Sequence, residues 1–71
     1  MNISLAQQIE EVEREIALRE RVYPHQVASG KMRQSVADYH LDRMRAVFRT
    51  LTWLQENEEA IKRKTGTEPP R

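Results

Sequence analysis

The sequence predicts an all-α fold: a helical hairpin with a long first helix, a short helical corner and a longer C-terminal helix, in one domain of residues 1–64. Three observations support this prediction. Residues 35–64 contain neither Gly nor Pro and carry apolar side chains at helical spacing. Residues 5–23 repeat apolar side chains at steps of four, three, four and seven. Pro24 and Gly30 lie between these segments and mark a reversal of the chain.

The first helix is expected over residues 4–22. Ser4 is suited to begin it, because Gln7 three positions later completes a capping box. Arg19 occupies the one polar position of its apolar seam, which otherwise consists of Leu5, Ile9, Val12, Ile16 and Tyr23.

Two pairs of opposite charge favour this helix. Glu10 lies four positions before Arg14, and Glu15 lies four positions before Arg19. This order stabilises a helix by about 0.2–0.5 kcal/mol for each pair.

The corner between the helices is expected to begin at Pro24, because proline lacks the amide that a helix interior needs. A short helix over residues 24–29 then ends at Gly30, which can adopt the left-handed conformation that ends helices. Tyr23, Val27 and Met32 are the apolar side chains expected to fill the corner.

The long helix is expected over residues 33–64. Ser35 is a candidate cap, with Asp38 three positions later completing a capping box. A start near Arg33 is the alternative, although arginine is a poor cap. Residues 65–71, with two prolines, are expected to form a flexible tail.

The long helix is apolar over more of its circumference than one neighbour covers. The rows of apolar side chains along this helix together span roughly 200° of its circumference. One neighbouring helix needs an apolar arc of only roughly 100°. A chain of 71 residues also buries little surface, and without Cys it has no disulfide to compensate. We therefore expect a homodimeric four-helix bundle. The expected dimer interface consists of Tyr39, Met44, Val47, Phe48, Leu51, Trp53 and Leu54. The alternative is a monomer in which Tyr39 and Trp53 are partly exposed.

Charge and hydropathy argue against a membrane partner and against a general electrostatic attraction to nucleic acid. The net charge of +1 creates no general attraction to nucleic acid or membranes. No basic segment followed by an apolar run begins the chain, and nowhere do 18 apolar residues follow one another. We therefore expect a soluble, cytoplasmic protein without a membrane partner.

No constellation of residues points to catalysis, a cofactor or a metal. The chain has no Cys, and His40 is a lone histidine on an apolar stripe, where packing is the usual role. Ser29-Gly30-Lys31 lacks the glycine spacing and the preceding strand of a phosphate loop. We therefore expect no catalytic, cofactor-binding or metal-binding residues.

A basic segment, residues 31–49, is the only candidate for phosphate contacts. Its candidate contact residues for phosphate or another partner are Lys31, Arg33, Arg45 and Arg49. Acidic side chains, Asp38 and Asp42 among them, share the outer face of the same helix, and interleaved signs are typical of a solvated surface. Nucleic-acid binding is therefore kept as an alternative.

Three sequence runs carry a resemblance to a known group of proteins. They are Glu13-Arg14-Glu15-Ile16-Ala17-Leu18-Arg19-Glu20-Arg21-Val22-Tyr23-Pro24, Val27-Ala28-Ser29-Gly30-Lys31-Met32 and Ala37-Asp38. Over about residues 9–54 the chain resembles small uncharacterised helical proteins encoded by bacteriophages and prophages. Those proteins usually have Thr in place of Arg33 and an acidic residue near Val36, so a capping box is lost here. The resemblance implies a phage or prophage setting, and hence a host cell, without an established activity.

These observations lead to one expected function and one alternative. We expect a non-enzymatic phage or prophage accessory protein that binds an unknown host or phage protein as a dimeric helical module. The alternative is a small nucleic-acid-associated protein that uses residues 31–49.

Overall fold

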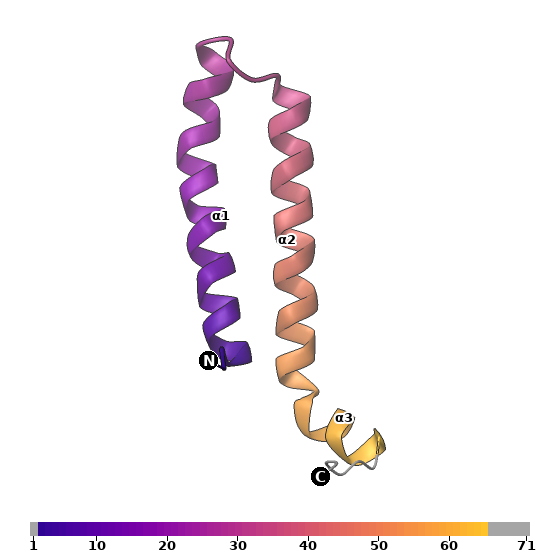
Figure 1. Cartoon of the computed structure of the whole chain (residues 1–71). Coiled ribbons are helices and arrows are strands. Elements are labelled where there is room, and N and C mark those ends of the chain that lie inside the picture. The colour runs from indigo at the N-terminus through magenta and orange to yellow at the C-terminus, as the bar shows by residue number, and fades with distance from the viewer. Residues whose placement is uncertain (1, 66–71) are drawn as a thin grey trace.

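Two long helices lie side by side in the computed structural model, which describes the backbone of residues 2–65 and the side chains as far as Ile61. The helices are α1 (Leu5–Ala28), α2 (Gln34–Glu56) and α3 (Glu58–Thr65). Helices α1 and α2 pack antiparallel, and α3 bends away at the end of α2 (Figure 1). The predicted all-helical hairpin is confirmed, and no strand occurs in residues 2–65.

Helix α1 begins with the predicted capping box. The Ser4 hydroxyl accepts a hydrogen bond from the Gln7 amide at 3.1 Å, and the Ser4 amide donates to Gln7 Oε1 at 2.9 Å. The two residues thus satisfy each other's free backbone donors at the helix start.

Helix α1 continues through Pro24 to Ala28, so the predicted end at residue 22 and the separate helix over residues 24–29 are wrong. Pro24 removes the hydrogen bond that would reach the Glu20 carbonyl, at a cost of roughly 3 kcal/mol in a helix interior. Tyr23 and Val27 line a hollow with α2, and burying such side chains stabilises by about 1.5–3 kcal/mol each. Tertiary packing therefore outweighs the local preference of proline.

The turn after α1 has the predicted left-handed glycine. Gly30 has a φ of 80°, and its amide donates to the Val27 carbonyl at 3.1 Å. The Lys31 amide donates to the Gln26 carbonyl at 2.8 Å. These two bonds form a Schellman motif, which satisfies the last carbonyls of α1 and turns the chain toward α2.

Helix α2 begins at Gln34, so the predicted cap at Ser35 is wrong and the alternative start near Arg33 is confirmed. Arg33 is extended, and its carbonyl accepts hydrogen bonds from the amides of Val36 and Ala37. No side chain caps this end. Asp38 accepts a hydrogen bond from Gln34 instead, at 2.9 Å.

The predicted single helix over residues 33–64 is also wrong, because Asn57 separates α2 from α3. The side-chain amide of Asn57 donates to the Trp53 carbonyl at 2.8 Å, and its backbone amide donates to the same carbonyl at 3.0 Å. Asparagine competes in this way with the regular helical ladder. Thr65 belongs to α3, and the rest of the predicted flexible tail lies outside the described residues.

The hairpin is a single layer with little buried core. Among the residues whose side chains are described, only Ala37 is buried, at 2% exposure. The apolar seam of α1 and its neighbours on α2, such as Leu41 and Phe48, are half-buried. Domains usually bury their apolar stripes between at least two layers. This hairpin therefore leaves both of its broad faces open.

Replacing Pro24 with Ala is expected to stabilise the hairpin, because it restores the donor for the Glu20 carbonyl. Without proline the unfolded chain has more conformational entropy, which offsets part of this gain. The expected net increase in unfolding free energy is therefore about 1–2 kcal/mol. Urea titration followed by circular dichroism measures it. A loss of stability would show that Pro24 holds the corner in shape.

Candidate protein-interaction surface

One broad face of the hairpin carries two open hollows that meet at Val47. The hollow nearer the open end has a volume of about 620 Å³, and its apolar lining includes Ile3, Val12, Val47 and Leu51. The hollow nearer the corner, about 590 Å³, is lined by Val47 and by Arg19, Tyr23, Met32, His40, Arg43 and Met44. We call this surface the Val47 face and define it by Ile3, Val12, Arg19, Met44, Val47 and Leu51.

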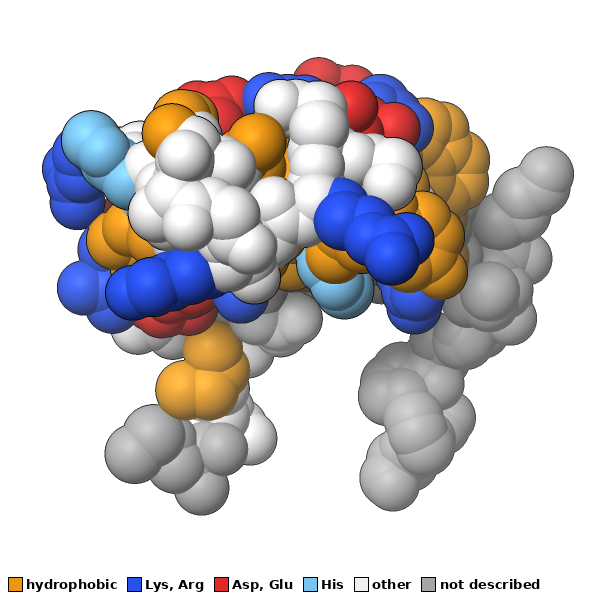
Figure 2. Space-filling model, turned by 90° about the horizontal axis from the view of Figure 1, so that it is seen from above, with side chains coloured by type: hydrophobic (Ala, Val, Ile, Leu, Met, Phe, Trp, Pro, Cys, Tyr) orange, Lys and Arg blue, Asp and Glu red, His pale blue; other side chains and the backbone are white. Residues whose placement is uncertain are grey.

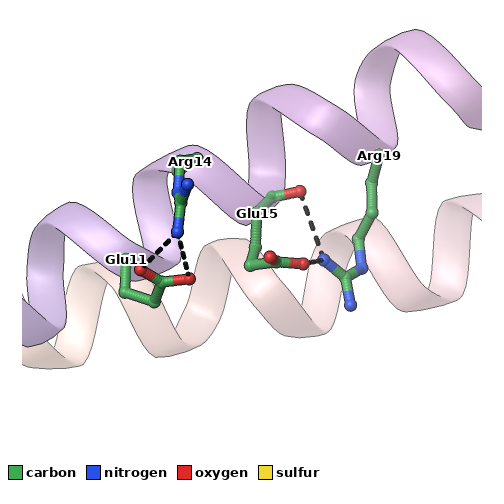
Figure 3. Close-up of polar contacts among 4 residues, drawn as sticks. All are labelled: Glu11, Arg14, Glu15 and Arg19. Atoms are coloured by element: carbon green, nitrogen blue, oxygen red, sulfur yellow. Dashed lines mark hydrogen bonds and ion pairs between the residues drawn. The ribbon is translucent and has the colours of Figure 1, made fainter.

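Charged side chains of α1 border the Val47 face (Figure 3). Arg14 donates to both carboxylate oxygens of Glu11, at 3.0 and 3.1 Å. The prediction that Arg14 pairs with Glu10 is wrong, because Arg14 pairs with Glu11, three positions before it. The predicted pair of Glu15 and Arg19 is confirmed.

Arg19 is a fixed positive charge at a half-buried position. Its guanidinium donates to the Glu15 carboxylate and, at 3.2 Å, to the Glu15 carbonyl. The hydrogen bond to the Glu15 carboxylate raises the pKa of Arg19 above its usual value, while burial opposes the shift. The apolar seam of α1 therefore contains a persistent ion pair near its middle.

The flank of α2 beside this face carries an aromatic and cationic group. Arg43 donates to the Tyr39 hydroxyl at 2.6 Å, and its guanidinium carbon lies 5.0 Å from the centre of the Tyr39 ring. The rings of Tyr39 and His40 meet edge to face, 5.5 Å apart. Within the described part of the chain, no cluster of three His, Asp or Glu side chains could hold a metal ion.

The opposite broad face also carries charged side chains. We call it the Glu20 face and define it by Glu13, Ala17, Glu20, Leu41, Arg45 and Phe48. Arg45 donates across the hairpin to Glu20 at 2.5 Å, so these charges are paired. Phe48 lies beside Ile16 in a hollow of about 360 Å³. Seen from the corner, charged and apolar side chains alternate around the outline of the molecule (Figure 2).

The structure divides the predicted interface residues between different sides of α2. Met44, Val47 and Leu51 line the Val47 face, and Leu54 follows Val47 by seven positions on the same side. Phe48 instead belongs to the Glu20 face.

Tyr39 and Trp53 lie outside both broad faces. They are 53% and 55% exposed. At 100° per residue, Trp53 is about 160° around α2 from Ala37, which faces α1. The two aromatic rings therefore project away from α1.

Sequence reasoning placed the interface on α2 alone and missed the contribution of α1. Ile3, Val12 and Arg19 complete the Val47 face from the other helix. The sequence contained one sign that α1 contributes to this face, which is the polar residue Arg19 within the otherwise apolar seam of α1. Its meaning depends on which sides of the two helices face each other.

The predicted phosphate-contact residues do not form one patch. Arg45 is paired with Glu20, and Arg49 is exposed farther along α2. Lys31 and Arg33 are exposed at the corner. Like Arg49, neither has an ion-pair partner among the side chains described, and Lys31 and Arg33 are the two unpaired charges that lie together at the corner.

The predicted corner residues act mainly in packing and turning. Tyr23, Pro24 and Val27 line a hollow of about 140 Å³ on the side of the Glu20 face. Met32 lies with Tyr23 on the Val47 face, and Gly30 makes the turn. These residues join the two helices, and none carries a free charge.

Comparisons with protein-family models, with curated proteins and with solved structures gave no match. None of the described helices has the length and apolar character needed to cross a bilayer.

The different surroundings of Phe48 and Trp53 predict different costs of truncation. Phe48→Ala is expected to lower the unfolding free energy by about 2 kcal/mol, because it removes half-buried contacts between the helices. Trp53→Ala is expected to change it by less than about 0.5 kcal/mol, because the indole is exposed. Chemical denaturation at low protein concentration measures both. Equal losses would contradict the placement of these rings.

Proposed function

We propose that this chain is a non-enzymatic, protein-binding module that acts as a homodimer, with two hairpins packed through their Val47 faces into a four-helix bundle. One observation carries the proposal: a single residue is buried among the described side chains, while Ile3 and Val47 remain open on one face beside the half-buried Met44 and Leu51. Ile3 is 53% exposed and Val47 is 46% exposed. A contiguous open apolar face of this kind typically marks an interaction site.

The energetics favour association. Covering a large apolar side chain stabilises by about 1.5–3 kcal/mol, and each copy offers Ile3, Val47 and the half-buried Met44, Leu51 and Leu54. Loss of translational and rotational freedom costs about 4–15 kcal/mol. Partial burial of these side chains on both copies is comparable in size to that cost. The resulting bundle would give each helix two neighbours, as four-helix bundles do.

The biological setting is proposed from the resemblance to small phage- and prophage-encoded proteins. On that basis the dimer is an accessory protein in the cytoplasm of the host cell, and its partner is an unidentified host or phage protein. Surfaces outside the Val47 face remain for that partner. They include the exposed rings of Tyr39 and Trp53 and the charged Glu20 face.

Val47→Glu tests the dimer. It places a charge in the proposed interface on both copies, and we expect the dimer to weaken about 100-fold or more. Ala46→Glu is the matched control, because this neighbouring residue is exposed and points about 100° away. Sedimentation over micromolar concentrations measures both. A wild-type chain that stays at 8.4 kDa, or a Val47→Glu chain that associates normally, would overturn the proposal.

The unpaired charges of Lys31 and Arg33 favour a second candidate, nucleic-acid binding at the corner. Phosphate contacts of this kind make binding strongly dependent on salt. Under the leading proposal we expect no binding to duplex or single-stranded DNA or RNA at about 50 mM salt, where such contacts are strong. Fluorescence anisotropy checks this. Binding that is lost when Lys31 and Arg33 are changed to Ala would favour the second candidate.

A further inference from the structure

We infer that the second copy lies antiparallel on the Val47 face, with its corner over the open end of the first, so that Glu15 of each copy faces Arg19 of the other. This inference rests on the proposed dimer and specifies how its copies are oriented. A two-fold axis lying in the Val47 face would cross the two helices at the level of Ala17 along α1 and of Val47 along α2. These residues are level with each other, because Ile16 lies beside Phe48 and Glu20 is bonded to Arg45.

The charge along α1 is the first argument. On the side of the Val47 face, Glu11 and Glu15 lie toward the open end of α1 and Arg19 lies toward the corner. The corner adds Lys31 and Arg33 at the basic end. An antiparallel second copy places each acidic half of α1 against a basic half. Opposite charges across an interface favour one orientation over another.

The alternative two-fold arrangement brings both corners to the same end and packs α1 of one copy against α2 of the other. The level of Glu20 with Arg45 then places Arg19 of one copy near the level of Arg43 of the other, and both of these side chains line the Val47 face. Like charges would meet at the corner end, which disfavours this arrangement.

The ion pair on α1 is the second argument. Glu15 and Arg19 lie at equal distances on either side of Ala17. A two-fold axis at Ala17 therefore sets each carboxylate opposite a guanidinium of the other copy, and four charges of alternating sign come together. Arg19 is already half-buried, and a covered charge without such partners is destabilising. A polar residue in an apolar seam is a known means of fixing register.

The shape of the Val47 face is the third argument. Val47 separates two hollows of similar volume, about 620 and 590 Å³. An axis at Val47 places the apolar hollow near the open end of one copy against the hollow near the corner of the other. Met32 and Met44 at the corner end can then fill the hollow lined by Ile3, Val12 and Leu51. Methionine side chains fill irregular gaps well.

Mixing two charge variants tests the facing of Glu15 and Arg19. In the Glu15→Lys homodimer the introduced lysine faces Arg19, and in the Arg19→Glu homodimer the introduced glutamate faces Glu15, so each is expected to weaken about tenfold. An equimolar mixture is expected to form heterodimers with near wild-type affinity, because every facing pair again has opposite signs. Within each chain residues 15 and 19 still have like charges, so recovery cannot come from contacts inside one hairpin. A mixture that recovers no affinity would overturn the inference.

Glu13→Lys is the matched control for charge, because Glu13 lies on the Glu20 face of the same helix. We expect the dimer affinity of this variant to equal that of the wild type. A loss as large as that of Glu15→Lys would point to the Glu20 face and overturn the inference.

A distance measurement tests the orientation directly. The chain has no Cys, so Ser29→Cys provides a single site for a spin label at the exposed corner. At 1.5 Å per residue, the antiparallel dimer places the two labels about 40 Å apart, whereas corners at one end would place them about 15–20 Å apart. Pulsed dipolar EPR measures this distance. A dimer with the short distance overturns the orientation alone, whereas a chain that stays monomeric overturns the proposed function as well.

Discussion

A layer of two helices can shelter only the strip along which the helices meet, and the rest of this structure follows from that constraint. Ala37 is the one buried side chain among those described, and it lies beside the corner. Farther along, Val12, Met44 and Leu51 are covered from one side only. Their other sides open onto the Val47 face. The apolar residues that stabilise the hairpin are thus the same residues that form its open interaction surface.

The sequence predicted the fold correctly where the interactions join residues that are close in sequence. The capping box of Ser4 with Gln7 and the left-handed Gly30 depend on residues close in sequence, and both were predicted from it. The prediction of a break at Pro24 and the prediction of an unbroken helix over residues 33–64 were wrong for opposite reasons. The break expected at Pro24 is suppressed by packing against α2, which local preference does not include. The break at Asn57 is accompanied by a side-chain hydrogen bond to the Trp53 carbonyl, in a segment without Gly or Pro.

The candidate surface was predicted only in part. Helical spacing identified Met44, Val47, Leu51 and Leu54 as apolar and close together, and all four lie on one side of α2. Spacing within one helix does not show where the neighbouring helix lies. Phe48 therefore turned out to contact α1 residues on the other face, and Trp53 projects outward. The location of Arg19 on the Val47 face could be recognised only once the position of α2 beside α1 was known.

The short turn at Gly30 also has a consequence for how the chain folds. Near the turn, Val27 and Ala37 line one hollow and are close in sequence, whereas Val12 and Leu51, which line a hollow at the other end, are far apart in sequence. Closing a small loop costs less entropy than closing a large one. Loop-closure entropy therefore favours contacts at the turn over contacts near the termini. Small helical domains with mostly local contacts fold on a microsecond to millisecond timescale.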